Sequence, residues 1–363
     1  MEFGKIPVAA AKGAILGHSV SLTNGVLKKG IVLDQPDIAL LVESEIDSVY
    51  AARLDDDDIG ENAAASAIAK VLAGQGVRVA TTTSGRANLF AIKAGVVDID
   101  GDIINQLNRL DESLTVACLQ PFERVEVGQM LATVKIIPYA VSKASIEAGL
   151  ALVSNAYAGD PLVGGPLAGD PLVTDPLVGD SAPVAVRAFE KKRVGLIITR
   201  LAHTKQSVLD KTEQVMAERV QSMGSELGRI SVVDHNANAV SLALNTLIPH
   251  HDVALVFGAS AIVDRADVVP VAVLQVDGKI EHLGMPVDPG NLLLLAQIGD
   301  MPVIGVPTCA RSLKRNGFDW VLERLLADIT VTAADLQTMG VGGLLKEIPS
   351  RPHPRARVRE RQE

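Results

Sequence analysis

A proline-rich repeat divides this chain and limits what it can fold into. Residues 160–179 read DPLVGGPLAGDPLVTDPLVG, with prolines at positions 161, 166, 171 and 176. Each proline lacks a backbone donor and disfavours helix at the residue before it, so neither a helix nor a central strand can continue through the segment. We interpret 158–188 as an extended or disordered linker. An interaction motif is the alternative, because Leu and Val recur in the repeat.

The linker predicts an N-terminal mixed α/β region, 1–157, and a second domain, 189–331. The N-terminal strands and helices look too short to build a large core of their own. The C-terminal segment, 332–363, ends in SRPHPRARVRERQE, which is rich in arginine and has no apolar period. We expect a disordered basic tail there, with binding of an anionic partner as the alternative.

Composition narrows the class of protein. Hydrophobic residues make up 48% of the 363 residues, enough for a large core, and the formal net charge of −9 argues against nucleic acid as a partner. No apolar run approaches the roughly 18 residues that span a bilayer, so we expect a cytoplasmic protein without a membrane partner. Cys118 and Cys309 are the only cysteines, and we expect two buried, reduced thiols.

The region after the linker alternates apolar strands with amphipathic helices. Strands are expected at 193–199, 229–233, 253–257, 280–285, 292–296 and 302–306, and helices at 207–227, 237–247, from 267 onward and at 316–328. Ser207 and Asp210 resemble a capping box at the first helix. This alternation predicts an α/β domain whose mostly parallel sheet is covered by helices on both faces.

Polar and turn-forming residues follow the predicted strands, at the edge where parallel sheets bind ligands. They are Thr199, Ser207, Asp234, Gly258, Ser260, Asp264, Asp267, Pro289, Gly290 and Pro307. A run of donors before the first helix suits an anion, because helix N-termini carry unpaired amides and a positive dipole end. Helix capping by Asp234 and Asp267, and a simple Pro-Gly turn, are the alternatives for individual residues.

Several specific chemistries lack support in the sequence. GASAI (258–262) approaches the Gly-x-Ser-x-Gly turn of serine hydrolases, but Ile262 is β-branched where that turn needs a small residue. No Walker A loop, no Gly-x-Gly-x-x-Gly after a strand and no histidine pair at metal-ligand spacing is found.

Three motifs, with their spacing, resemble the molybdopterin-binding domain shared by molybdopterin adenylyltransferase and molybdopterin molybdenumtransferase. VFGASAIVDRADVVPVAV (256–273) resembles the family's Thr-Gly-Gly loop followed by an aspartate, and SVVDHNANAVSLAL (231–244) its Asp-then-helix segment. GMPVDPGNLLLLAQIGDMPVIGVP (284–307) resembles its Pro-Gly loop and strand pair. Less closely, 13–33 and 88–100 look like the front half of stand-alone molybdopterin-binding proteins, some relatives of which continue into a cytidylyltransferase domain.

The resemblance implies a three-layer αβα domain that binds a phosphorylated pterin dithiolene, or its adenylated form. Amides of Gly258, Ala259 and Ser260 would hold the phosphate, with Thr199, Ser207, Pro289, Gly290, Asn291 and Pro307 as further substrate contacts. Asp234 and Asp267 would be catalytic, and Asp267 with Asp264 would bind Mg²⁺.

The chain departs from the family pattern at three points. Ala259 replaces a glycine, Asn291 and Leu292 replace the Lys-Pro of the Pro-Gly-Lys-Pro loop, and 307–310 reads PTCA in place of Pro-Gly-Asn-Pro. Arg265, Arg311 or Lys314 could supply the missing cation.

Three functions stay open at this point. The first is a transferase of molybdenum cofactor biosynthesis that inserts molybdate into adenylated molybdopterin. The second is a non-catalytic carrier that passes the cofactor to a cytidylyltransferase or a molybdenum hydroxylase. The third is an unrelated sugar-phosphate or nucleotide-phosphate enzyme with the same sheet topology. By analogy with the related enzymes, we expect a homodimer with the N-terminal region at or near the interface.

Overall fold

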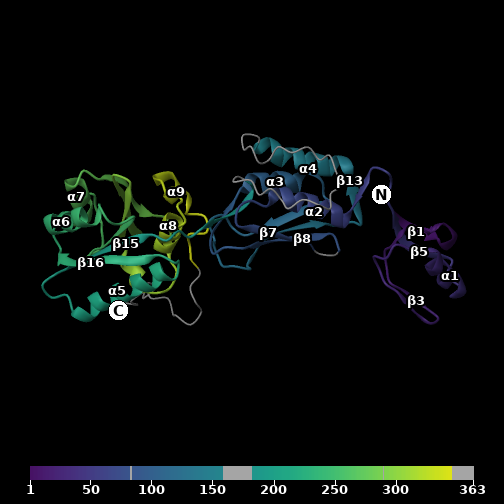
Figure 1. The fold of residues 1–363 in the computed structure, drawn as a ribbon, viewed down its shortest axis with the longest axis horizontal. Coiled ribbons are helices and arrows are strands. Elements are labelled where there is room, and N and C mark those ends of the chain that lie inside the picture. Colours follow the sequence, from purple (N-terminus) through teal and green to yellow (C-terminus); the bar gives the residue numbers. More distant parts are fainter. Residues whose placement is uncertain (82–83, 158–181, 289, 346–363) are drawn as a thin grey trace, which may run out of the picture. The chain divides into compact units, whose positions relative to one another are not determined.

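The computed structural model describes residues 1–81, 84–157, 182–288 and 290–345 (Figure 1). The chain falls into two compact units, Met1–Ala188 and Phe189–Glu363. The repeat at 160–179 and the basic tail lie outside the described residues. Val184–Ala188, which the sequence assigns to the linker, forms strand β14, so regular structure resumes earlier than expected.

Unit 1 begins with a small antiparallel sheet. Its strand order is β1-β5-β2, formed by Glu2–Pro7, Ser48–Arg53 and Ile15–Leu16. Helix α1 (Gln35–Glu43) starts at a capping box made by Asp34 and Asp37. The hairpin β3 (Val20–Leu22) and β4 (Gly25–Leu27) completes this part, whose core includes Leu16 and Leu41.

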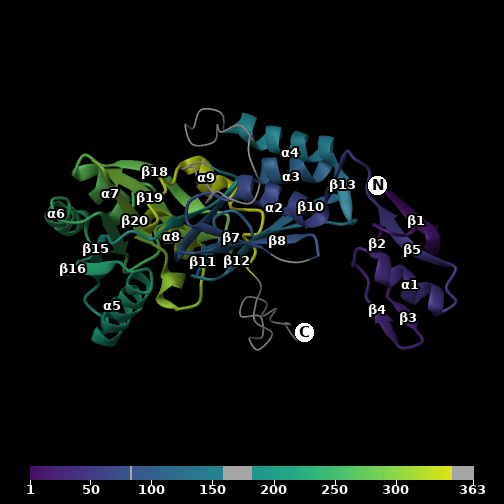
Figure 2. The same cartoon turned by 45° about the vertical axis from the view of Figure 1, so that its right-hand side comes forward.

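The rest of unit 1 has a large core of its own, contrary to the sequence-based expectation. The helices α2 (Glu61–Leu72), α3 (Gly101–Leu110) and α4 (Lys143–Ala156) pack together and against the antiparallel sheet β10-β12-β8-β7 (Figure 2). Those strands are Leu114–Cys118, Met130–Ile136, Arg86–Ala91 and Val77–Thr81. The core is large although the strands are short. Helices and strands from distant parts of the chain all contribute apolar side chains to it.

Two smaller sheets complete unit 1. One has the order β11-β9-β14, formed by Arg124–Val125, Gly95–Ile99 and Val184–Ala188. The other pairs β6 (Asp58–Gly60) with β13 (Ala140–Ser142). Because β14 pairs antiparallel with β9, the residues on both sides of the proline repeat belong to one folded unit.

Unit 2 contains a six-stranded sheet with the order β16-β15-β17-β20-β19-β18. The first four are parallel: Glu226–Asp234, Arg193–Arg200, Val253–Phe257 and Met301–Val306. The last two, Asn291–Ile298 and Lys279–Met285, are antiparallel. The prediction of a mainly parallel α/β sheet is confirmed.

Helices cover both faces of this sheet. On one face, α5 (Gln206–Gln221), α8 (Gly317–Leu326) and α9 (Ala333–Thr338) share a core with Leu255 and Phe257. On the other, α6 (Ala237–Leu247) and α7 (Val268–Gln275) share a core with Ala254 and Val256. Side chains alternate between the faces of a strand, so a strand buried on both sides reads as the continuous apolar run seen in the sequence.

Several local expectations need correction. Helix α5 starts after Lys205, which makes no side-chain cap, so Ser207 and Asp210 do not form a capping box. Cys309 is exposed and Cys118 is half-buried, so the two free thiols are not both buried. The sequence predicted that the second domain ends at 331. Leu336 and Met339 nevertheless pack into the core of unit 2, so the domain continues beyond that residue.

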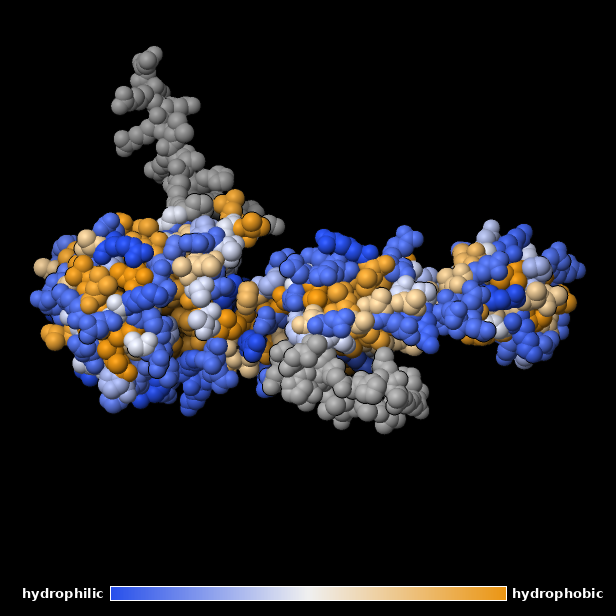
Figure 3. Space-filling model, turned by 90° about the horizontal axis from the view of Figure 1, so that it is seen from above, coloured by the Kyte–Doolittle hydropathy of each residue, from blue (hydrophilic) through white to orange (hydrophobic). Residues whose placement is uncertain are grey.

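The surface of the described part mixes polar and apolar patches (Figure 3). Apolar side chains exposed on unit 2 include Leu201, Val208, Val232, Leu242, Val263, Leu313 and Val341. No helix among the described residues is long and apolar enough to cross a membrane.

Candidate functional site

Four loops of unit 2 leave the sheet at one edge because β15, β16, β17 and β20 are parallel. They follow Arg200, Asp234, Phe257 and Val306 and lead into α5, α6, α7 and α8. The turn between β18 and β19 lies at the same edge, since β19 runs antiparallel to β20 and begins where β20 ends. The sheet topology thus gathers the five loops in which the sequence placed the candidate residues.

Thr199 joins three of these loops. Its side chain is buried, with 1% exposure, at the end of β15, which lies between β16 and β17 in the sheet. Thr199 Oγ1 accepts a hydrogen bond from the Ala259 amide at 2.6 Å, contacts His235 Nδ1 at 2.8 Å and donates to the Phe257 carbonyl at 3.4 Å. The Ala259 amide is therefore already paired, which corrects the expectation that it is free to hold a phosphate.

His235 is a residue that the sequence reasoning missed. It follows Asp234, between the end of β16 and the start of α6, and its Nε2 lies 3.2 Å from Ser260 Oγ. The only sequence signal for His235 is its position directly after a predicted strand, because it is not part of a histidine pair at metal-ligand spacing. His235 connects buried Thr199 with exposed Ser260 and so links the loops after β16 and β17.

The turn after β17 depends on Gly258. A Cβ atom there would lie 2.6 Å from the carbonyl oxygen of Ser260, too close for any side chain. Ile262 is buried in the core at 3% exposure, and a Cβ on Gly305 would lie 2.6 Å from its Cδ1. Ile262 fits because Gly305 leaves room for it, so the branched residue does not prevent a tight turn at Ser260.

Arg311 supplies a cation at this edge. Its guanidinium lies 4.4 Å from the Phe257 ring centroid, and it donates to Thr212 Oγ1 at 3.3 Å and to the Gly258 carbonyl at 3.5 Å. Burial lowers the pKa of Arg311, and among the described residues no carboxylate pairs with it. A half-buried arginine without a counter-ion favours binding of an anion nearby.

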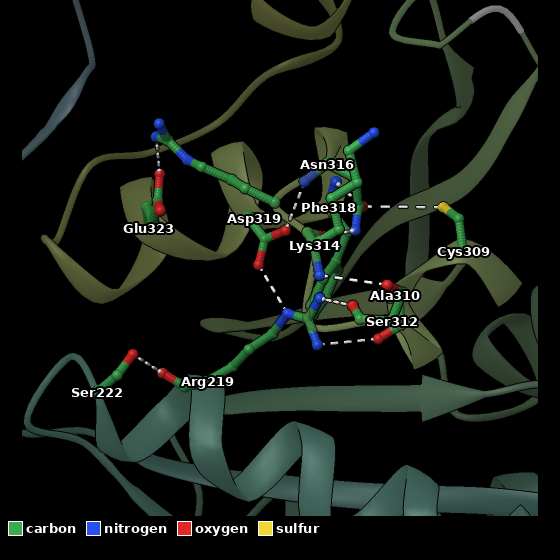
Figure 4. A network of polar contacts seen from close by, with 11 residues as sticks. Arg219, Ser222, Cys309, Ala310, Ser312, Lys314, Asn316, Phe318, Asp319 and Glu323 are labelled. Carbon is green, nitrogen blue, oxygen red and sulfur yellow. Dashed lines mark hydrogen bonds and ion pairs between the residues drawn. The ribbon is translucent and has the colours of Figure 1, made fainter. Parts of the chain in front are cut away.

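A second arginine, Arg219 on α5, fixes the loop that carries Arg311 (Figure 4). Arg219 Nε donates to Asp319 Oδ1 at 2.7 Å, Nη1 donates to the Ala310 carbonyl at 2.9 Å and Nη2 donates to the Ser312 carbonyl. Asp319 also accepts from the Asn316 amide at 2.7 Å in the capping box of α8. This buried network connects α5, the loop after β20 and the start of α8.

The three candidate aspartates are engaged in local contacts. Asp267 is the N-cap of α7: Oδ1 accepts from the Val268 amide at 2.7 Å and Oδ2 from the Val263 amide at 3.2 Å. Asp264 Oδ1 accepts from the Ala266 amide at 2.8 Å, and exposed Asp234 lies 3.5 Å from Arg200. Within the described ranges no three His, Cys, Asp or Glu side chains gather as metal ligands. These three carboxylates do not form a complete Mg²⁺ site by themselves.

The remaining predicted contacts are scattered along the same edge. Ser207 is exposed in the first turn of α5, and Pro307 is buried before the short 3₁₀ helix η2 (Thr308–Arg311). Pro289 lies outside the described residues, and Gly290 has a positive φ of 100°. Asn291 is buried at 5% exposure, with neither side-chain Nδ2 nor Oδ1 paired to a described group. The role of Asn291 as a substrate contact stays a prediction.

A cavity of about 540 Å³ lies at the opposite edge of the sheet. It is lined by residues where β17 and β20 begin and where β19 ends, including Asp252, Ile298 and Met301, with His251, Lys192 and Asp328 beside them. It contains none of the predicted site residues. We place the candidate site at the carboxyl edge because the polar junction at Thr199 lies there.

Unit 2 is thus an α/β domain with a mainly parallel sheet and a polar junction of three loops at its carboxyl edge. No protein-family model matches the chain, and no curated protein matches its sequence. Similar solved structures include a molybdenum cofactor biosynthesis protein B, which is 20% identical and has a TM-score of 0.31 over 39% of this chain and 96% of that one.

Two further structures complete the comparison. A molybdopterin biosynthesis MoeA protein from Pyrococcus horikosii is 11% identical, with a TM-score of 0.30 over 90% of this chain and 75% of that one. A CinA protein of unknown function from Thermoplasma acidophilum is 13% identical, with a TM-score of 0.26 over 38% of this chain and 98% of that one.

Proposed function

We propose that unit 2 binds molybdopterin at the carboxyl edge of its sheet and acts in molybdenum cofactor biosynthesis. The proposal rests on the three sequence motifs and on one structural observation, the junction at Thr199. There the loops after β15, β16 and β17 are held together by side-chain hydrogen bonds. The three-layer αβα arrangement of the molybdopterin-binding type is part of the same proposal.

The phosphate of the ligand would bind near the loop 258–262. Among the described groups, none accepts a hydrogen bond from the amides of Ser260 and Ala261, and Arg311 lies against the carbonyl side of Gly258. Backbone amides and a guanidinium without a carboxylate partner are donors that suit a phosphate. Arg311 would then take the part of the lysine that Asn291 replaces.

Mg²⁺ would require oxygens from the ligand. Mg²⁺ is commonly held by one or two carboxylates together with substrate phosphates, so an incomplete protein site is compatible with it. Asp267 and Asp264 are the carboxylates that we propose for this role, with Asp234 on the neighbouring loop. When bound, the ion would neutralise charge on the phosphate oxygens.

The activity that we propose is molybdenumtransferase-like: insertion of molybdate into adenylated molybdopterin. The second candidate is a carrier that binds the cofactor without catalysis and hands it to a cytidylyltransferase or molybdenum hydroxylase. Asn291 stands where the family pattern has a lysine, and its side chain is buried. The Pro-Gly loop therefore has no lysine to meet molybdate, which favours the carrier. Release of AMP with incorporation of molybdenum supports the transferase; tight binding without either supports the carrier.

Asp267→Asn tests the site. We expect Mg²⁺-dependent binding of adenylated molybdopterin, followed by pterin fluorescence, to weaken roughly tenfold or more, equivalent to at least ~1.4 kcal/mol. Thermal stability should fall only modestly, by about 1 kcal/mol, because the Asn oxygen still accepts from the Val268 amide while the Val263 amide loses its acceptor. Asp252→Asn is the matched control: it accepts one backbone hydrogen bond, from the Arg193 amide, at the opposite edge of the sheet. Equal affinities in the two variants would contradict the assigned role of Asp267.

Ala259→Gly tests the steric part of the proposal. If the Ala259 methyl group crowds the phosphate, removing it should leave binding unchanged or strengthen it. Weaker binding, with an unchanged melting temperature, would count against phosphate at this loop. We also propose a homodimer, and light scattering at micromolar concentration that gives a monomer mass would contradict it.

A further inference from the structure

Three side chains at the carboxyl edge form a continuous chain of polar contacts. Ser260 Oγ lies 3.2 Å from His235 Nε2, and His235 Nδ1 lies 2.8 Å from Thr199 Oγ1. Ser260 is exposed, His235 is half-buried and Thr199 is buried. An exposed hydroxyl, an imidazole and a buried orienting group in this order are the arrangement by which proteins activate a serine.

The contacts of Thr199 assign the protons along this chain. A hydroxyl donates one hydrogen bond and accepts two. Thr199 Oγ1 accepts from the Ala259 amide and has two other partners, the Phe257 carbonyl and His235 Nδ1. The carbonyl can only accept, so all three contacts are satisfied together only if Thr199 donates to Phe257 and His235 donates from Nδ1. Nε2 of a neutral His235 then carries the lone pair and accepts from the Ser260 hydroxyl.

The turn around Ser260 suits an attacking hydroxyl. Ser260 follows β17, which is buried along its length, and the turn is made by Gly258. Ile262, which in the sequence argued against such a turn, lies in the core beside Gly305. The amides of Ser260 and Ala261 have no acceptor among the described residues and are available to an oxyanion that forms beside Oγ.

We propose that Thr199, His235 and Ser260 form a nucleophilic site that accepts an acyl group from an activated carboxylic ester. Ser260 Oγ bonds to the carbonyl carbon while its proton moves to His235 Nε2. The bond to the leaving alkoxide breaks, and His235 gives that proton to the alkoxide. Water then attacks the acyl carbon while His235 takes a proton from it, the bond between the acyl carbon and Ser260 Oγ breaks, and His235 returns the proton to Oγ. Overall, ester and water become acid and alcohol. The site uses the Ser260 and Ala261 amides that are proposed above to hold a phosphate, so acyl transfer and phosphate binding at this loop exclude each other.

Thr199 is a positioning residue in this scheme. It holds Nδ1 protonated and the ring aimed at Ser260, but it carries no charge to stabilise the imidazolium that forms. The site should therefore react more slowly than one oriented by a carboxylate, and a covalent probe is a better test than turnover of a chosen ester. An alkyl phosphonofluoridate reacts by forming the Oγ–P bond and releasing fluoride, with the serine proton passing to His235.

The experiment measures the rate of labelling of the full chain by this probe, with peptide mapping of the modified residue. We expect modification at Ser260, abolished in Ser260→Ala and slowed about 10²-fold in His235→Gln, the usual size of a general-base effect. Ser241→Ala and His250→Gln, on and after α6, are the controls and should label as the unaltered chain does. Melting curves check that each variant is folded.

Thr199 is tested by one variant that keeps the hydroxyl and one that replaces it by a methyl group. Thr199→Ser should keep the labelling rate, whereas Thr199→Val should slow it at least tenfold, because the imidazole loses its orienting partner. Labelling of Ser260→Ala at the unaltered rate, or His235→Gln that labels like His250→Gln, would overturn the proposal.

Discussion

Arg219→Met should destabilise unit 2 more than any other exchange of an arginine in an ion pair of that unit. Arg219 and Asp319 are buried, with side-chain exposures of 6% and 11%, and their atoms lie 2.7 Å apart. Removing one partner of a buried pair costs about 3–5 kcal/mol, because the other charge stays buried without compensation. The Ala310 and Ser312 carbonyls also lose their donor. A loss of this size lowers Tm by about 6–20 °C for a domain of this length.

Urea unfolding followed by tryptophan fluorescence measures this effect. Trp320 is the only tryptophan, and it packs against the core of unit 2, so its emission reports that unit. Arg193→Met is the matched control: its pair with Glu226 is 3.2 Å long, but the two side chains are 54% and 50% exposed. The control should cost less than about 1 kcal/mol. If Arg219→Met and Arg193→Met lose the same free energy of unfolding, the network does not fix the loop.

The remaining predictions concern a turn, a carboxylate and the linker. Gly258→Ala places a Cβ 2.6 Å from a carbonyl oxygen and should cost about 1–3 kcal/mol in urea unfolding, whereas Gly340→Ala, with ordinary contacts, should cost little. Ser145 Oγ donates a hydrogen bond to Asp111 Oδ2 at 2.5 Å and holds the pKa of Asp111 below its usual value. Ser145→Ala should therefore destabilise unit 1 at neutral pH. The difference in stability should fade as pH falls below about 4, where the carboxylate becomes protonated. Equal losses at pH 7 and pH 3 would contradict this. Limited proteolysis should cut within 158–183 before it cuts the folded units, and because β14 pairs with β9 the fragments should elute together under native conditions.

The sequence predicted the elements of unit 2 where the apolar pattern was unambiguous. The strand at 253–257 and the helix at 237–247 have the predicted bounds, because one is a continuous apolar run and the other starts after the capping residue Asn236. Helix α5 ends at Gln221, not 227, since the chain turns at Gly224 with φ of 77° and then enters β16. The large core of unit 1 was missed because several of its strand pairs, such as β8 with β12 and β9 with β14, join segments far apart in the sequence.

In the candidate site, too, the sequence predicted some features and missed others. From the sequence alone, polar residues could be placed after each strand, and parallel strands predict that these residues share one edge. Which of them touch was decided by the strand order, because β15 lies between β16 and β17 and puts Thr199 between the loops of both. The Thr199–Ala259 and His235–Ser260 contacts span 60 and 25 residues, distances over which no local pattern carries information.

The sequence by itself determined the class of the second domain and the polar residues of the carboxyl-edge loops, because these follow from apolar periodicity and from the order of strands and helices. The domain boundary was not determined in this way, because β14 pairs with β9 and unit 1 extends to Ala188. Only the tertiary structure decided that Asp267 caps α7, that Asn291 is buried and that Arg311 lies over Phe257. These outcomes depend on packing between elements. A side chain's partners are set by the neighbours that the fold brings within hydrogen-bond distance, and residue type fixes only what it can offer them.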